Sequence, residues 1–215
     1  FNEEKKIKSV ISELSSSFKN IVAVNDGSTD STQEILESLD VVILRHSINL
    51  GAGAAISTGF KFIQSSQNAH AVVTFDADGQ HSVEDAKAFA REILVCKEEI
   101  IFGSRFIKNK SNIPIIKRIV LSVVVFFTNI LSKVNLSDAH NGLKAIKKTT
   151  LKKINIDIDQ YGYESQIINE VSKKGITYKE MPTNTIYTEY SKNKGQKLNN
   201  GLIILEDLFK SRGKK

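Results

Sequence analysis

The sequence predicts one domain of the α/β class, in which helices cover both faces of a mostly parallel central sheet. Short apolar runs that suit buried strands alternate along the chain with stretches of helical periodicity. The 215 residues are enough for one sizeable core, and the alternation leaves no obvious place to divide them. Several strand-like runs also end in polar strings, at the edge where open α/β sheets bind ligands. We therefore expect a single three-layer α/β/α domain over residues 1–215.

The first half of the chain predicts three helices and three strands in turn. Helical spacing of apolar residues predicts an amphipathic helix over residues 3–18 and two more helices that end near Leu39 and Gln64. Between them, strands are predicted at 21–24, 41–44 and 72–75. Gly27 favours a sharp turn after the first strand, and the Ser, Thr and Asp residues that follow it are candidate N-caps.

The second half continues the alternation. Helices are predicted at 83–95, 113–131, 163–174 and 201–210, and strands at 100–105, 143–146, 176–181 and 185–188. Residues 189–215 are expected to supply a mobile basic loop and a C-terminal amphipathic helix. Cys96, the single cysteine, is expected in the core and excludes a disulfide framework within the chain.

The stretch from Ile113 to Leu131 is strongly apolar. Its uninterrupted part, residues 119–127, is far shorter than the ~20 apolar residues that span a bilayer, so it does not predict a transmembrane helix. Basic residues at its start leave three interpretations open: core, oligomer interface or in-plane membrane contact. We expect a helix that is partly exposed in the monomer.

Charge indicates the kind of partner. The formal net charge is +6 and the pI is about 9.2, which favours anionic partners. The sequence has neither an RNA-binding motif with interleaved aromatic residues nor a zinc-ligand cluster, so nucleic acid is not expected. Phosphate groups or an acidic membrane surface are the expected partners.

Two carboxylates follow the predicted strand 72–75. Asp76 and Asp78 would lie at the carboxyl end of a buried strand, with Gly79 suited to a tight turn. Hard oxygen ligands in this arrangement suit Mg²⁺ or Mn²⁺ together with phosphate oxygens of a substrate. A solvated turn without function and an aspartyl-phosphate phosphatase remain alternatives. An EF-hand is excluded, because its sixth and twelfth positions would be His81 and Lys87.

Other polar strings also follow predicted strands. Asn49 to Gly53 matches a dinucleotide fingerprint only weakly, and its small residues suit close packing of a helix near an anion. Arg105 ends a strand, where it is well placed to pair with phosphate. His140 lies in a polar turn and is expected to be an ordinary loop histidine.

Taken in order along the chain, these strings resemble the family 2 glycosyltransferases of the GT-A fold, a Rossmann-like fold. The similarity is greatest to the polyprenyl-phosphate sugar transferases. The motifs that carry the resemblance are Phe1–Glu3, Asn25–Asp30, Asn49–Gly51, Asp76–His81, Gly103–Phe106 and Asp138–Ala145. Asn25 departs from the family, which usually has Asp at this position, and the family's first strand precedes the printed chain.

The resemblance implies roles for individual residues. Glu3 and Asp26 would hold the base and ribose of a nucleotide-sugar, with Ser28 also on the donor side. The metal on the diphosphate would be bound by Asp76, Asp78 and Gln80. Arg105 would meet phosphate, Asp138 would lie near the acceptor, and Lys194 would belong to a loop that closes over the substrates.

The implied activity is an inverting, metal-dependent transfer of a hexose from a UDP- or GDP-sugar. Mg²⁺ or Mn²⁺ would be the cofactor, and the acceptor would be a polyprenyl phosphate such as undecaprenyl or dolichyl phosphate. We expect a peripheral enzyme at the cytoplasmic face of the membrane, and it could form a homo-oligomer. Two alternatives are a family 2 enzyme that glycosylates a saccharide and a non-catalytic nucleotide-sugar-binding module.

Overall fold

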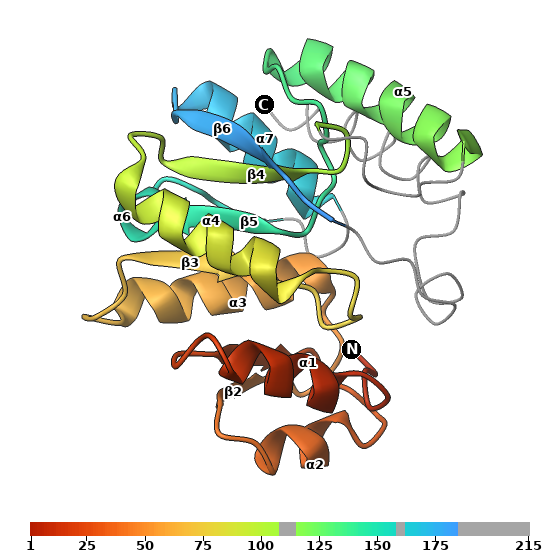
Figure 1. The fold of residues 1–215 in the computed structure, drawn as a ribbon, viewed down its shortest axis with the longest axis vertical. Coiled ribbons are helices and arrows are strands. Elements are labelled where there is room, and N and C mark those ends of the chain that lie inside the picture. Colours follow the sequence, from red (N-terminus) through yellow and green to blue (C-terminus); the bar gives the residue numbers. More distant parts are fainter. Residues whose placement is uncertain (108–114, 158–161, 185–215) are drawn as a thin grey trace.

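A computed structural model describes residues 1–107, 115–157 and 162–184 of the chain (Figure 1). The predicted strand at 185–188, the helix at 201–210 and Lys194 lie outside these described residues. The described part contains strands and helices in alternation, so the predicted α/β class is confirmed.

The strands form two sheets. Strands β1 (Val22–Asn25) and β2 (Val42–Arg45) are a parallel pair. The second sheet has the order β3-β5-β4-β6, and its strands are Ala71–Thr74 (β3), Lys144–Lys147 (β5), Ile100–Ser104 (β4) and Tyr178–Pro182 (β6). Because β5 is antiparallel to both β3 and β4 while β6 is parallel to β4, three of these four strands run in one direction. The sheet is therefore mostly parallel, as predicted, with β5 as the exception.

The direction of β5 decides where the site forms. Thr74 at the end of β3 pairs with Lys144 at the start of β5. The turn that precedes β5 therefore lies beside the residues that follow β3. Polar residues after β3, after β4 and before β5 are in this way brought to one edge of the sheet.

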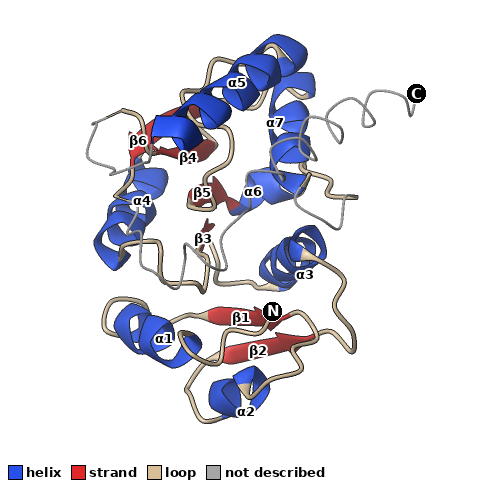
Figure 2. Ribbon diagram, turned by 90° about the vertical axis from the view of Figure 1, so that its right-hand side faces the viewer, coloured by secondary structure: helices blue, strands red, loops and turns tan. Residues whose placement is uncertain are grey.

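Helices cover both faces of the four-stranded sheet (Figure 2). Helix α4 packs on one face, and α3, α6 and α7 lie toward the other. The helices are Ile7–Ser15 (α1), Thr32–Glu37 (α2), Ala52–Ser65 (α3), Val83–Val95 (α4), Ile115–Ser132 (α5), Lys148–Leu151 (α6) and Tyr163–Lys173 (α7). The one-turn helix α6 was not predicted. Helix α1 begins four residues later than predicted, because residues 3–6 form a turn in which the Glu3 carbonyl accepts from Lys6 and Ile7.

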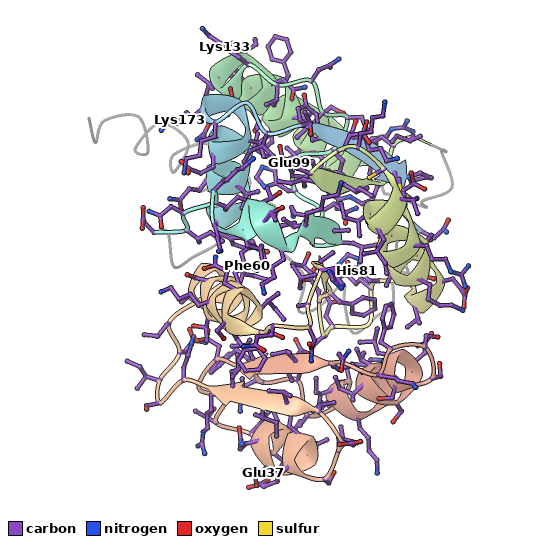
Figure 3. The ribbon with its side chains drawn as sticks, turned by 90° about the vertical axis from the view of Figure 1, so that its left-hand side faces the viewer. Glu37, Phe60, His81, Glu99, Lys133 and Lys173 are labelled. Atoms are coloured by element: carbon purple, nitrogen blue, oxygen red, sulfur yellow. The ribbon has the colours of Figure 1, made fainter. Side chains whose placement is uncertain are left out.

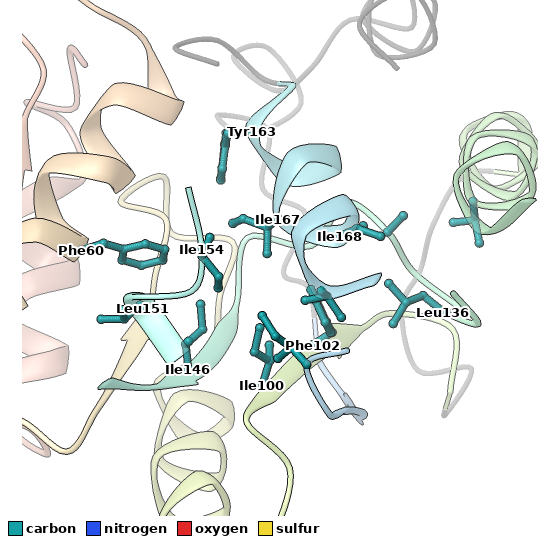
Figure 4. Packing of buried hydrophobic residues seen from close by; sticks show 14 residues of the cluster. Phe60, Ile100, Phe102, Leu136, Ile146, Leu151, Ile154, Tyr163, Ile167 and Ile168 are labelled. Carbon is teal, nitrogen blue, oxygen red and sulfur yellow. The ribbon is translucent and has the colours of Figure 1, made fainter. Parts of the chain in front are cut away.

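Strand β4 supplies both halves of the core. Ile100 and Phe102 point into a cluster with α6 and α7, whereas Ile101, between them, points into the cluster with α4 (Figure 4). All three are at most 2% exposed, and burying side chains of this size contributes about 1.5–3 kcal/mol each. This core fixes the sheet edge on which the polar residues lie.

Two predictions about apolar residues are refined by the structure. Cys96 follows the end of α4 in extended backbone and is half-buried, so it borders the core rather than lying in it. Helix α5 exposes Val123, Phe126, Phe127 and Ile130 on one side, which confirms that it is partly exposed in the monomer. Among the described residues, no helix has both the length and the apolar character needed to cross a bilayer.

Candidate functional site

Asp76 lies immediately beyond β3, against the turn that precedes β5. Thr74 links the two segments, since its Oγ1 donates to the Gly142 carbonyl at 2.5 Å and accepts from the Lys144 N–H at 3.0 Å. Gly142 is in turn packed so closely that an added Cβ would lie 2.1 Å from Asp76 Oδ2. The Asp76 side chain is nevertheless 51% exposed, so its carboxylate borders both the turn and solvent.

His81 orients the Asp76 carboxylate. Its Nε2 lies 3.0 Å from Asp76 Oδ2, and its ring packs edge-on against Phe75. Figure 3 labels His81, which lies just before α4. Burial opposes ionisation of Asp76, but the hydrogen bond to His81 and the charges of Lys144 and Arg105 outweigh it and lower its pKa. Asp76 is therefore held as a carboxylate. His81 is part of the predicted motif Asp76–His81, but this role was not predicted for it.

Asp78 has the opposite electrostatic environment. Burial is the main cause that raises the pKa of Asp78, and the nearby charges of Asp76 and Glu3 raise it further. The Gln80 N–H, which donates to Oδ1 at 2.9 Å, opposes this shift without reversing it. Gln80 was predicted as a metal ligand through its side chain. In the structure its side-chain amide nitrogen donates to Asp78 Oδ2 at 2.7 Å, which positions that carboxylate, and the role of Gln80 as a metal ligand stays a prediction.

These residues suit a hard divalent cation. Besides burial, the charge of Asp76 raises the pKa of Asp78, and a cation bound between the two carboxylates would relieve this repulsion. Within the described residues, no group of three or more His, Cys, Asp or Glu side chains is arranged to hold a metal ion. Asp76 and Asp78 would thus leave coordination positions for water and phosphate oxygens, as Mg²⁺ and Mn²⁺ sites on phosphate substrates do.

Asp26 holds a loop. Its Oδ1 accepts from the Leu50 N–H at 2.9 Å and lies 2.7 Å from His46 Nδ1, and its Oδ2 accepts from the Gly51 N–H at 2.8 Å. Burial opposes ionisation, but these partners outweigh it and lower the pKa of Asp26. Both carboxylate oxygens are thus engaged within the protein, and the predicted role of Asp26 in binding base or ribose stays a prediction. His46 was missed, although the register that pairs Asn25 with Arg45 places it beside Asp26.

The N-terminal residues are fixed across the turn that follows β1. The Asn2 N–H donates to Ser28 Oγ at 2.9 Å, and the Glu3 N–H donates to Thr32 Oγ1 at 2.8 Å. Besides burial, the charge of Glu3 also raises the pKa of Asp78, which indicates that Glu3 lies near the carboxylate pair. Ser28 binds the N-terminal segment, and its predicted place on the donor stays a prediction.

Arg105 and Asp138 bind each other. Arg105 Nε donates to Asp138 Oδ2 at 2.6 Å, and Nη2 donates to Oδ1 at 2.7 Å and to the His140 carbonyl at 2.9 Å. The Asp138 side chain is completely buried, and although burial opposes ionisation, the Arg105 charge lowers its pKa. Asp138 was predicted to lie near the acceptor. Its carboxylate is instead engaged by the arginine that was predicted to meet phosphate.

In and beside the same turn lie three titratable side chains for which no role was predicted. Burial lowers the pKa of His140 to about 4, and its Nε2 is buried without a hydrogen-bond partner in the described part of the chain. Lys144 was treated as an ordinary strand residue and Glu164 as an ordinary helix residue. Both are buried, and they form an ion pair beside the turn. Lys144 stands within an otherwise apolar strand, and this feature of the sequence could have indicated a buried ion pair.

Comparison with known families identifies the chain. Residues 1–155 match the family described as glycosyl transferase family 2. The chain belongs to glycosyl transferase family 2. It is therefore a glycosyltransferase, and the resemblance seen in its motifs is confirmed.

Relatives of this family 2 glycosyltransferase include proteins named for lipid phosphate acceptors. UDP-N-acetylglucosamine–dolichyl-phosphate N-acetylglucosaminyltransferase of Methanococcus voltae is 33% identical over 232 residues, covering 97% of this chain and 92% of the relative. Undecaprenyl-phosphate mannosyltransferase of Micrococcus luteus is 23% identical over 184 residues, covering 81% and 74%. An uncharacterized protein of Methanocaldococcus jannaschii is 37% identical over 214 residues, covering 97% and 88%.

Solved structures support the fold of the glycosyltransferase. Glucosyl-3-phosphoglycerate synthase from Mycobacterium tuberculosis, in complex with Mn²⁺, UDP-glucose and phosphoglyceric acid, superposes with a TM-score of 0.73. The identity is 14%, and the match covers 99% of this chain and 77% of that one. The predicted GT-A fold is confirmed.

Proposed function

We propose that this glycosyltransferase moves a hexosyl group from a nucleoside-diphosphate sugar to a polyprenyl phosphate, with inversion at the anomeric carbon. An oxygen of the acceptor phosphate forms the new bond to that carbon, and the bond to the donor diphosphate breaks. The nucleoside diphosphate leaves with the electron pair. UDP and GDP are the candidate nucleotides, and Mg²⁺ or Mn²⁺ the candidate cofactor.

The observation that carries the proposal is the Asp76–Asp78 pair at the end of β3. Asp76 is ionised and half-exposed, and Asp78 lies close enough for their charges to interact. A bound divalent cation would neutralise charge that develops on the leaving diphosphate. His81 and Gln80 orient the two carboxylates, which reduces the reorganisation needed when the donor binds.

The turn 138–142 favours a phosphate over a sugar hydroxyl as acceptor. A hydroxyl needs a base to take its proton, whereas a phosphate monoester, with a second pKa of roughly 6, is largely ionised at neutral pH. Asp138 is engaged by Arg105 and buried. His140 has a pKa of about 4, which makes it a weak base. The names of relatives that act on dolichyl and undecaprenyl phosphate agree with this choice.

Helix α5 supplies the proposed contact with the membrane. Its exposed side carries Val123, Phe126 and Phe127, which line a hollow together with Ser122 and Arg118. An apolar surface bordered by a cation suits the chain and headgroup of an anionic lipid. We propose that the enzyme binds peripherally, at the cytoplasmic face, through this surface. A homo-oligomer that buries the same residues is the alternative.

Substituting the carboxylates tests the proposed site. We expect Asp76→Asn and Asp78→Asn each to fold, to lose Mn²⁺ binding, and to lower transfer by about 10²–10⁴-fold, since several kcal/mol of charge stabilisation disappears. Asp40→Asn, a change on the exposed surface, is the matched control. Mn²⁺ binding is measured by electron paramagnetic resonance and transfer with radiolabelled donors. Near-native turnover of a folded Asp78→Asn protein would contradict the proposal.

The acceptor is tested separately. Labelled UDP- and GDP-sugars are offered with undecaprenyl phosphate, dolichyl phosphate or oligosaccharides, and products are separated by solvent extraction. Label in the organic phase is the expected result. Transfer to the oligosaccharide alone would favour the second family 2 activity, and donor binding without transfer to any acceptor would favour a binding module.

A further inference from the structure

A buried ion pair lies beside the site, and the proposed chemistry does not use it. Lys144 is 1% exposed and Glu164 is 7% exposed. Lys144 Nζ donates to Glu164 Oε2 and, at 2.5 Å, to the Asn141 carbonyl. Buried ion pairs are expensive to desolvate, and apolar residues of similar size often serve stability equally well. Stability alone is therefore a weak reason for these two charges.

The contacts of Lys144 indicate what the pair holds. Three successive carbonyls in the turn accept hydrogen bonds from side chains of three different segments. His140 accepts from Arg105, which follows β4; Asn141 accepts from Lys144 on β5; and Gly142 accepts from Thr74 on β3. The backbone path of the turn is thus fixed residue by residue.

The turn has little freedom because of what it faces. Gly142 contacts the Asp76 carboxylate, where even a methyl group would overlap Oδ2. A shift of the Asn141 carbonyl would move Gly142 against or away from Asp76. Glu164, at the start of α7, accepts a hydrogen bond from Lys144 Nζ and compensates its charge.

We infer that Lys144 and Glu164 are positioning residues that hold the Asn141–Gly142 backbone against Asp76, and so set the geometry of the metal–diphosphate site. This inference rests on the proposed function. Their side chains bond to each other and to the turn. Loss of the pair would free the turn and move Asp76, and hydrogen exchange in residues 138–144 distinguishes this from the direct effect of the Lys144 charge on Asp76.

A double substitution separates positioning from stability. Lys144→Met with Glu164→Leu removes both charges at similar volume and leaves neither charge unpaired, so the protein is expected to fold. Mn²⁺ affinity is expected to fall about 10–100-fold, as when partners of metal ligands are removed. Hydrogen exchange of backbone amides in residues 138–144 should become faster. The matched control is Lys179→Met with Glu92→Leu, which removes a half-exposed ion pair between β6 and α4.

The outcomes are distinct. A folded double variant with wild-type Mn²⁺ affinity, or with unchanged exchange in residues 138–144, overturns the inference while the proposed function stands. Wild-type protein that binds no Mn²⁺ overturns the proposed function and this inference with it. If the double variant does not fold, Glu164→Gln decides the question, because it keeps the shape of the side chain and removes only its charge. A several-fold loss of Mn²⁺ affinity is expected there, and unchanged affinity overturns the inference.

Discussion

At the scale of single residues, Asp26 joins the two loops that follow β1 and β2. Asp26→Asn should lower the free energy of unfolding by about 1–3 kcal/mol, because the part-buried N–H donor of Leu50 and the buried N–H donor of Gly51 lose an ionised acceptor. Denaturant titration measures the change, with Asp40→Asn on the exposed surface as control. Equal stability of the two variants would contradict the structural role.

The same carboxylate gives a pH dependence with a defined sign. The pKa of Asp26 is lowered from 3.8 in the folded state, so its stabilisation is present above the unfolded pKa and is lost as the pH falls through the folded value. We therefore expect the difference between wild type and Asp26→Asn to be constant near neutral pH and to shrink below about pH 4. Unfolding curves at several pH values measure this, and a difference that grows in acid would show the opposite linkage.

A single methyl group added at Gly142 should lower the affinity of the site for metal. In Gly142→Ala the new Cβ would lie 2.1 Å from Asp76 Oδ2 and displace the carboxylate from its place beside the turn and His81. We expect a folded protein whose Mn²⁺ affinity is lower by about 10–100-fold. Gly59→Ala is the control, because its Cβ would meet only Val24 Cγ2 at 3.6 Å. Titration with Mn²⁺ measures both, and equal affinities would mean that the turn does not restrict Asp76.

Ligands bind where the strands of an open α/β sheet end, and this rule identified residues of the candidate site. It did not identify the side chains that contact them. Asp76 and Asp78 were found because a buried strand runs directly into them. The pairing of Arg105 with Asp138 was missed, because the two are 33 positions apart and each was assigned to a substrate. Lys144 was missed because burial of a lysine depends on a partner, Glu164, from another element.

At the scale of elements, the positions of strands and helices were predictable and the direction of β5 was not. Apolar runs define a strand regardless of its neighbours, which is why the strands lie within two residues of their predicted positions. Direction depends on how the chain returns to the sheet. The connection from β4 to β5 contains α5 and is therefore long enough for a parallel crossover as well. Only the register of β5 beside β3 reveals that the turn 138–142 reaches Asp76.

Helix α5 is the element whose surface the proposal uses. Val123→Ser with Phe126→Ser should weaken attachment to anionic vesicles by about tenfold or more, because each buried apolar side chain contributes about 1.5–3 kcal/mol. Val124, which lies between these residues in the sequence, is 2% exposed and belongs to the core, so it is left unchanged. Leu94→Ser is a matched control, since Leu94 is a 63% exposed residue on α4. Cosedimentation with vesicles measures attachment.

Two results would contradict attachment to the membrane through α5. Unchanged sedimentation of the Val123/Phe126 variant would mean that α5 is not the contact. A smaller molar mass of the variant in light scattering would instead identify α5 as an interface between copies of the chain.

At the scale of the whole molecule, the candidate site lies between the N-terminal residues and the four-stranded sheet. Residues of the N-terminal part, such as Glu3, approach the carboxylates that follow β3, and the turn before β5 closes the other side. The sequence predicted three layers because alternating helices must cover both faces of a sheet. It did not predict that β1 and β2 form a sheet of their own, because strand pairing is a long-range property.

Donor binding should therefore stabilise the whole fold. A ligand that binds only the folded state at about 100 times its Kd adds about 2.7 kcal/mol, and about 2–4 °C per kcal/mol is typical for a chain of this size, so Tm should rise by about 5–10 °C. We expect this rise with Mn²⁺ and either UDP or GDP, and little with the nucleoside monophosphate, which lacks the second phosphate for the metal. Asp78→Asn should show no metal-dependent rise, because the carboxylate that would bind the cation is gone. Differential scanning fluorimetry across the nucleotides measures the shift and identifies the preferred base. An equal rise without metal, or in Asp78→Asn, would mean that the nucleotide binds away from the end of β3.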